Sequence, residues 1–189
     1  MPTATSVDSL AASLRRLAEG RDPEAWSAVV ARQGDAIHGV CRRILRNGAL
    51  ADDAAQETLL ALRDYARHFK PRSDDADGDA RAWIARVAVT AALKVRRGEM
   101  RRQARERAAA REHAMSDGSD IPGSERMDEV LAALDSLPDR HRVPLLLHFV
   151  AGLDHERIAA SLGTTGGNAR VRVHRALTEL RSKLGASVS

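Results

Sequence analysis

The sequence is poor in the residues on which several kinds of function depend. It has a single cysteine, Cys41, so it forms no internal disulfide, and no CxxC motif or cluster of His and Cys residues surrounds it. We therefore expect Cys41 to be a buried structural thiol rather than a ligand or nucleophile. Only 3% of the residues are Phe, Trp or Tyr. The apolar residues are mainly Ala, Leu and Val, which favours packed helices over a sheet.

Membrane and catalytic signatures are also missing. No stretch approaches the roughly 18 apolar residues of a membrane helix, and the polar start MPTATSVDSL lacks the parts of a signal peptide. We therefore expect a cytoplasmic protein without membrane insertion. The segment GTTGG at 163–167 lacks the following Lys and the preceding strand of a phosphate-binding loop. With no metal-ligand spacing among the His residues and no paired nucleophile and base, the sequence predicts no enzyme, no metal and no cofactor.

Positive charge is concentrated in one part of the chain. Between Arg81 and Arg111 there are ten Arg and Lys residues against Glu99 and Glu106, although the whole chain carries a net charge of only +4. Such a local excess is typical of a protein that binds a polyanion. A merely solvated helix face is the alternative, but the acidic residues needed for many i,i+4 pairs are missing.

Apolar periodicity divides the first half into helices. A short helix runs from Leu10 to Leu17, and Asp22 followed by Pro23 predicts the start of a second, which Asn47-Gly48 would end. A third helix is expected from about Ala51 to Phe69, with Ala55, Leu59 and Leu62 inward. Polar turn residues at 70–79 predict a loop before a long helix that starts near Arg81.

The outer face of the third helix carries acidic and amide side chains beside one leucine. This combination fits a protein partner better than a DNA backbone, although a solvated face remains the simpler reading. The residues of this acidic strip are Asp52, Asp53, Gln56, Glu57 and Leu60.

The last part of the chain reads as a helix-turn-helix unit. Ile158, Ala159 and Leu162 form one face of a short helix, and Gly163 ends it. A longer helix starting near Gly167 or Asn168 carries an inward stripe of Ala169, Val173, Ala176, Leu180 and Leu184. Its outward side chains are rich in donors suited to base edges and phosphates. They are Asn168, Arg170, Val171, Arg172, His174 and Arg175.

Taken in order, these elements resemble the extracytoplasmic-function sigma factors, a group of the sigma-70 family of bacterial RNA polymerase initiation factors. Four stretches carry most of the resemblance: ADDAAQETLLAL at 51–62, RAWIARVAVTAALKVRR at 81–97, GLDHERIAASLG at 152–163 and RVRVHRALTELR at 170–181. RRLAEGRDPEAW near the start and LDSLPDRHRVPLLLHF before the short helix also match. The likeness therefore covers nearly the whole chain.

The resemblance implies roles for the surfaces above. The acidic strip would dock on the clamp helices of the polymerase large subunit. The loop at 70–79, with Arg81, Trp83, Arg86, Arg96 and Arg97, would read and open the downstream (−10) promoter element, although Trp83 is more simply a core residue. The last helix would read the upstream (−35) element. Thr90, Lys94, Asn168, Ala169 and Val171 depart from the usual pattern of the family, so the promoter sequence stays open.

The resemblance thus predicts an all-α initiation factor of two small helical domains. Domain 2 would span residues 1–107, a flexible linker 108–124 and helix-turn-helix domain 4 residues 125–189. Its partners would be core RNA polymerase, promoter DNA and an anti-sigma factor. Two alternatives remain: a sigma-like decoy that sequesters an anti-sigma protein, and a stand-alone helix-turn-helix repressor, which would need a dimerisation segment that the sequence does not display.

Overall fold

The chain is all-helical in the computed structural model, which describes residues 9–20, 22–113 and 125–186. The predicted all-α fold is confirmed, and no strand occurs within these ranges. The N-terminal unit consists of α1 (Leu10–Glu19), α2 (Pro23–Leu45), α3 (Gly48–Tyr65), the 3₁₀ turn η1 (Ala66–His68) and α4 (Ala76–His113). The C-terminal unit consists of α5 (Glu125–Asp135), α6 (Asp139–Phe149), α7 (His155–Leu162) and α8 (Gly166–Ala186).

Aspartate side chains accept hydrogen bonds from the free amides at the start of each of the first two helices. Asp22 accepts hydrogen bonds from the amides of Glu24 and Ala25, both at 3.0 Å, with Pro23 at the first helical position as the sequence predicts. The N-terminus of α1 is held by Asp77, which lies in the first turn of α4 and accepts from the amides of Leu10 and Ala11. A side chain of one helix thus satisfies the free amides of another.

The boundary between α2 and α3 differs from the prediction. Asn47 was expected to end α2, but α2 ends at Leu45 and the chain turns at Arg46, which has a left-handed φ of 55°. Asn47 instead begins α3, because its side chain accepts from the amide of Leu50 at 3.1 Å. Asn suits both a helix end and a helix start, and here the second role prevails.

The buried face of α3 is also turned from the predicted one. Ala55 and Leu59, which were expected inward, are only half-buried. The fully buried side chains are Ala51, Ala54, Thr58 and Leu62. Thr58 tolerates burial because its hydroxyl donates to the carbonyl of Ala54 at 2.7 Å, which leaves no unpaired polar group. A polar core residue of this kind gives no apolar signal in a sequence.

Helix α4 is longer than predicted at both ends. It begins at Ala76 rather than near Arg81, because the side chain of Asp75 accepts from the amide of Gly78 at 2.8 Å and its carbonyl from that of Asp79. It continues to His113, so the expected linker does not begin at 108. The Ala- and Arg-rich segment there favours a helix by propensity alone. The rest of that linker, residues 114–124, lies outside the described residues.

The helix-turn-helix forms as the spacing predicts. Helix α7 ends at Gly163, whose φ of 68° is a conformation that glycine adopts without strain. Helix α8 begins at Gly166, and the hydroxyl of Thr165 accepts from the amide of Asn168 at 3.3 Å. The helix thus begins slightly before the predicted start near Gly167 or Asn168, and Asn168 lies in its first turn.

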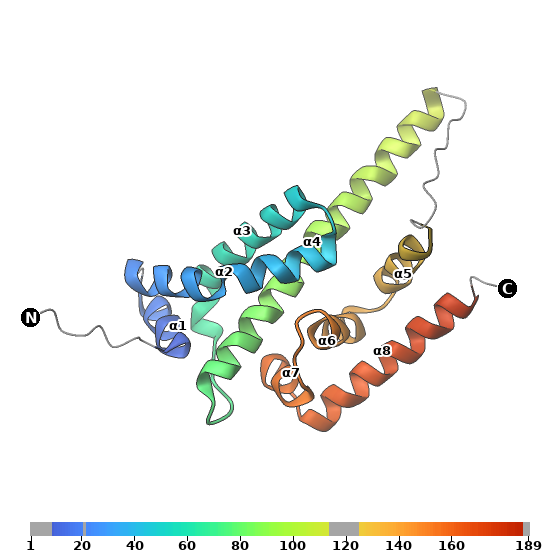
Figure 1. Cartoon of the computed structure of the whole chain (residues 1–189). Coiled ribbons are helices and arrows are strands. Elements are labelled where there is room, and N and C mark those ends of the chain that lie inside the picture. The colour runs from blue at the N-terminus through green and yellow to red at the C-terminus, as the bar shows by residue number, and fades with distance from the viewer. Residues whose placement is uncertain (1–8, 21, 114–124, 187–189) are drawn as a thin grey trace, which may run out of the picture.

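The two units pack against each other along α4. Figure 1 shows α4 as the longest helix, with α2 and α3 on one side and α6 and α7 beside it on the other. The buried side chains of both units form one continuous apolar cluster. Cys41 lies in it and is fully buried, as predicted, and burial raises the pKa of its thiol to about 11. Helix α4 therefore positions both units.

Candidate nucleic-acid and polymerase interfaces

Helix α8 presents one polar face to solvent. Ala169, Val173 and Ala176 are buried against α6 and α7, which fixes the rotation of the helix. Most of the outward set predicted from the sequence is exposed. Asn168, Arg170, Val171, His174 and Arg175 are exposed, and Arg172 is half-buried.

The cations of this face are available to a partner. Arg170 and Arg175 form no ion pair with any residue that the structure describes, and the first turn of α8 has no acidic residue. The nearest acid on the helix, Glu179, pairs with His141 of α6 at 3.0 Å. Exposed, unpaired guanidinium groups can donate to phosphates or in a bidentate manner to guanine. The face is therefore chemically suited to nucleic acid.

The acidic strip on α3 is exposed along its whole length. Asp52 accepts from His38 of α2 at 2.9 Å, and Glu57 accepts from Lys94 of α4 at 2.9 Å. Leu60 is 51% exposed, which is unusual for leucine. Since the core of the unit needs none of these side chains, the strip can contact a protein partner that offers cations around an apolar spot. Its residues are Asp52, Asp53, Gln56, Glu57 and Leu60.

The loop before α4 is ordered by a buried carboxylate. Asp79 is 3% exposed and accepts from the backbone amides of Arg72 and Ser73 at 2.6 and 2.7 Å. Burial by itself would raise the pKa of Asp79, but these amides, the Ser73 hydroxyl and Arg157 outweigh it and lower the pKa below its usual value. Sequence reasoning treated 70–79 as a plain loop and missed this anchor.

The aromatic residues near the loop divide into buried and exposed ones. Trp83 and Phe69 are both 7% exposed, and the centres of their rings are 5.8 Å apart, so both are core residues. Tyr65 is 54% exposed, and the centre of its ring lies 5.9 Å from the centre of the His68 ring. Only Tyr65 and His68 can therefore offer a ring to an unpaired base from this part of the described surface.

The four arginines predicted on α4 do not form one free basic patch. Arg81 is exposed, whereas Arg86 is half-buried, and burial, together with the charge of Arg72, lowers its pKa. Arg96 donates to both oxygens of Asp135, and Arg97 donates to Asp139 at 3.1 Å. Two of the four are thus engaged by acids of the C-terminal unit.

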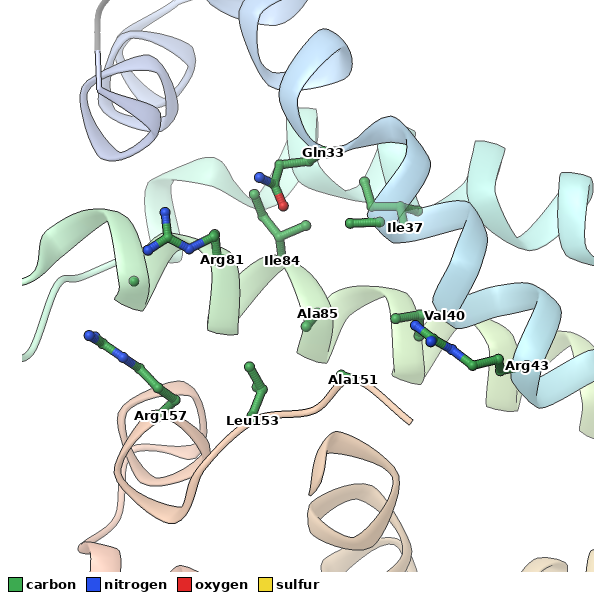
Figure 2. A pocket seen from close by; sticks show the side chains of 12 residues that line it. Gln33, Ile37, Val40, Arg43, Arg81, Ile84, Ala85, Ala151, Leu153 and Arg157 are labelled. Atoms are coloured by element: carbon green, nitrogen blue, oxygen red, sulfur yellow. The ribbon is translucent and has the colours of Figure 1, made fainter. Parts of the chain in front are cut away.

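A groove lies between the two units, where α2 and α4 face the C-terminal unit. It has a volume of about 260 Å³ and is lined by α2, α4, the segment that joins α6 to α7, and Arg157 of α7. Figure 2 shows Ala151 and Leu153 facing Ala85 across it, with Arg81 and Arg157 at one end and Arg43 at the other. Arg157 was not predicted as a functional residue, since an Arg in the first turn of α7 gives no periodic signal.

The described part of the chain holds no group of three His, Cys, Asp or Glu side chains placed to bind a metal. Within the same residues no helix is both long enough and apolar enough to cross a membrane.

Comparison with known proteins matches both units. A family model described as Sigma-70 region 2 matches residues 29–106, and one described as Sigma-70, region 4 matches residues 127–180. The RNA polymerase sigma factor CarQ of Myxococcus xanthus is 33% identical over 165 residues, which are 86% of this chain and 90% of that protein. The ECF RNA polymerase sigma factor SigE of Mycolicibacterium smegmatis is 29% identical over 163 residues. These are 84% of this chain but 61% of that relative, so the chain spans less than two thirds of it.

A solved structure shares the fold. The structure of CnrH in complex with the cytosolic domain of CnrY matches with a TM-score of 0.56 at 22% identity. The match covers 95% of this chain and 99% of that one, so both helical units are included.

Proposed function

The chain belongs to the sigma-70 family of RNA polymerase initiation factors, in its extracytoplasmic-function group, and from this premise we propose that it directs promoter-specific transcription initiation. The resemblance deduced from the sequence is thereby confirmed. The family consists of initiation factors and not of enzymes, and its members bind core RNA polymerase and promoter DNA. The N-terminal unit, up to the end of α4, serves as domain 2, and the C-terminal unit serves as domain 4.

One observation carries the proposal: the outer face of α8 is basic and exposed, and its Arg170 and Arg175 form no ion pair with any residue that the structure describes. In a helix-turn-helix the N-terminal part of the second helix enters the major groove. Arg170 lies near that end and is exposed, whereas its neighbours Ala169 and Val173 are buried. This helix therefore reads the upstream (−35) element, with Arg170 at base edges and Arg175, one turn further on, at phosphates.

The N-terminal unit contributes the other two contacts. The acidic strip on α3 docks on the clamp helices of the polymerase large subunit, since it is exposed and its carboxylates beside Leu60 fit a protein partner better than a DNA backbone. The loop that Asp79 orders reads the downstream (−10) element together with Arg81 and Arg86. Trp83 takes no part because it is buried, so any stacking on an opened base falls to Tyr65 or His68.

Control by an anti-sigma factor is part of the proposal. CnrH, which shares the fold, was solved with the cytosolic domain of CnrY bound. A protein partner that covers the surfaces of both units would keep the factor from polymerase. The chain acts in the cytoplasm, where the polymerase is.

Two other functions fit less well. A decoy that only sequesters an anti-sigma protein would not need the unpaired arginines of α8. A helix-turn-helix repressor reads paired half-sites as a dimer, whereas α8 places its apolar side against α6 and α7 of its own chain.

Reconstituted transcription tests the proposal. Core polymerase, free of other sigma factors, is mixed with the purified chain and a library of genomic fragments, and the transcripts are sequenced. We expect transcripts that start at a small set of sites with a shared upstream element and that are absent without the chain. Binding to promoter duplex by the free chain that is tight and needs no polymerase would favour the repressor instead.

A further inference from the structure

A small pocket lies where the loop before α4 meets the end of α7. It has a volume of about 130 Å³, room for about four waters at about 30 Å³ each. Its walls come from three places: the chain that leads from η1 into the loop, the first turns of α4, and the end of α7. No acidic side chain lines it. The lining residues are His68, Lys70, Arg72, Trp83, Arg86 and the segment 160–163.

Three cations of this pocket have no counter-charge in the described part of the chain. The side chains of Lys70, Arg72 and Arg86 form no ion pair and no hydrogen bond with any residue that the structure describes. The buried carboxylate of the loop, that of Asp79, is already occupied. It accepts from two backbone amides of the loop and pairs with Arg157 at 3.1 Å. The pocket therefore gathers donors and positive charge without an acceptor.

The two arginines of the pocket repel each other. Arg86 is half-buried, and this burial lowers its pKa, which the positive charge of Arg72 lowers further. An arginine does not lose its proton in a protein, so it cannot escape such a cost by becoming neutral. The guanidinium of Arg72 lies against the end of α7, where a Cβ on Gly163 would be 3.0 Å from its Nη2. A bound anion would offset both the burial and the repulsion.

The indole of Trp83 adds a neutral donor to the lining. Its ring is a core group, and the residue is only 7% exposed. The indole N–H nevertheless donates to no residue that the structure describes. A buried indole N–H usually has a hydrogen-bond partner. An acceptor held in the pocket would supply that partner as well as a counter-charge for the arginines.

The donors favour a phosphate group over other anions. Guanidinium groups bind carboxylates and phosphates alike through two parallel hydrogen bonds. A carboxylate, however, accepts hydrogen bonds mainly in one plane. The oxygens of a phosphate are arranged as a tetrahedron, so they can accept from the loop and from α4 at the same time. A group of this size also fits a space of about 130 Å³, whereas a long chain or a large ring system would not.

We propose that this pocket binds a small phosphate ligand, held by Lys70, Arg72 and Arg86 and by the indole N–H of Trp83. The phosphate is either free inorganic phosphate or the terminal group of a small phosphorylated metabolite. The inference goes beyond the proposed function, because neither polymerase nor promoter supplies this ligand.

The position of Arg86 gives the ligand a consequence for transcription, which rests on the proposed function. The same arginine is assigned above to the downstream (−10) element. Its guanidinium cannot serve a bound phosphate and a promoter strand at once. The phosphate therefore competes with the promoter strand at this contact.

Titration of the full chain with inorganic phosphate tests the site, with potassium chloride used to hold the ionic strength constant. Trp83 reports on the pocket once the second tryptophan of the chain, Trp26, is replaced by Phe. We expect a change in the emission of Trp83 that saturates, with a dissociation constant of about 1 mM or lower. In this background Arg72→Gln and Arg86→Gln should each weaken binding about three- to tenfold, because each removes charged donors.

Arg101→Gln is the matched control, since it removes an equal charge from an exposed position of α4 that does not line the pocket. Its affinity for phosphate should equal that of the parent. No saturable change up to about 10 mM phosphate would overturn the site. Equal weakening by all three variants would also overturn it, because this is the result of a general attraction between an anion and a basic chain. Circular dichroism of each variant checks that the helices are retained, and exposed Arg72 is the safer of the two pocket positions.

Titrations with pyrophosphate and with a nucleoside diphosphate identify the source of the phosphate. Both carry a terminal phosphate, and both are added at the same ionic strength. A nucleoside diphosphate that binds about tenfold more tightly than inorganic phosphate would assign the pocket to the end of a nucleotide. Equal or weaker binding of the nucleoside diphosphate would assign it to free phosphate.

Reconstituted transcription tests the competition at Arg86. We expect the transcript yield to fall as phosphate fills the pocket and to stay constant when potassium chloride replaces phosphate at equal ionic strength. An equal yield in the two salts would overturn the competition. If phosphate binds but no condition gives transcripts with core polymerase, the proposed function fails and the phosphate site stands. If transcripts form but no phosphate binds, the site fails and the proposed function stands.

Discussion

Arg96 of α4 and Asp135 of α5 form a two-pronged ion pair between the two units, with both side chains largely buried at 16% and 10% exposure. Periodicity and charge identify Arg96 as a cation available to DNA, whereas the folded chain holds it on one of its own carboxylates. The contrast separates what a residue can bind from what it binds in the free protein.

The acidic strip gives the first prediction. Replacing Asp53 by Lys should weaken binding to core polymerase about tenfold or more, because an exposed carboxylate that faces cations becomes a repelling charge. The melting temperature should change little, since Asp53 has no role in packing. Asp64→Lys, an equal charge reversal on the same helix beyond the strip, is the control. Equal core affinity for the two variants in a titration would remove the assignment.

The turn of the helix-turn-helix gives the second. Gly163→Ala should lower the free energy of unfolding by about 1–2 kcal/mol, because its φ of 68° strains any side chain. Gly167→Ala is the matched control. Its Cβ meets nothing within 4 Å and it lies inside α8, so this change should be neutral or stabilising by up to about 1 kcal/mol. Denaturant unfolding curves of both variants and of the wild type give the free energies of unfolding to be compared.

The contact between α4 and α1 gives the third, which depends on pH. Hydrogen bonds from the amide of Ala11, followed by that of Leu10, lower the pKa of Asp77 despite partial burial. Asp77→Ala should therefore cost about 1 kcal/mol of stability at neutral pH, as loss of a helix cap does.

The sign of the pH effect follows from the lowered pKa. The stabilisation by Asp77 is complete above the unfolded pKa of about 3.9 and is lost as the pH falls through the lower folded value. The difference between wild type and Asp77→Ala should thus be constant from about pH 5 to 7 and shrink below about pH 4. Asp74→Ala, in the exposed part of the loop, should show little difference at any pH. A gap for Asp77→Ala that grows on acidification would contradict the cap.

Sequence reasoning succeeds where a signal is local and repeats. The stripe of Ala169, Val173 and Ala176 determines the outer face of α8, and the pair Asp22-Pro23 determines the start of α2. It fails where a polar side chain occupies a core position, as Thr58 does. It also fails where one residue type suits both the end and the start of a helix, as Asn47 does. Contacts such as Arg157 with Asp79, 78 residues apart, leave no periodic trace.

Selection from a library of randomised upstream elements tests the central claim, that α8 reads promoter sequence through Arg170. The wild-type chain, Arg170→Ala and Arg175→Ala are each combined with core polymerase, and the upstream elements of the transcripts are sequenced. A bidentate contact of Arg with guanine is worth roughly 1–3 kcal/mol of discrimination, whereas a phosphate contact changes affinity without changing preference. We predict that Arg170→Ala relaxes the preference at one or two upstream bases and that Arg175→Ala lowers transcription from all elements alike. An Arg170→Ala chain that selects the same upstream bases as the wild type would contradict the account.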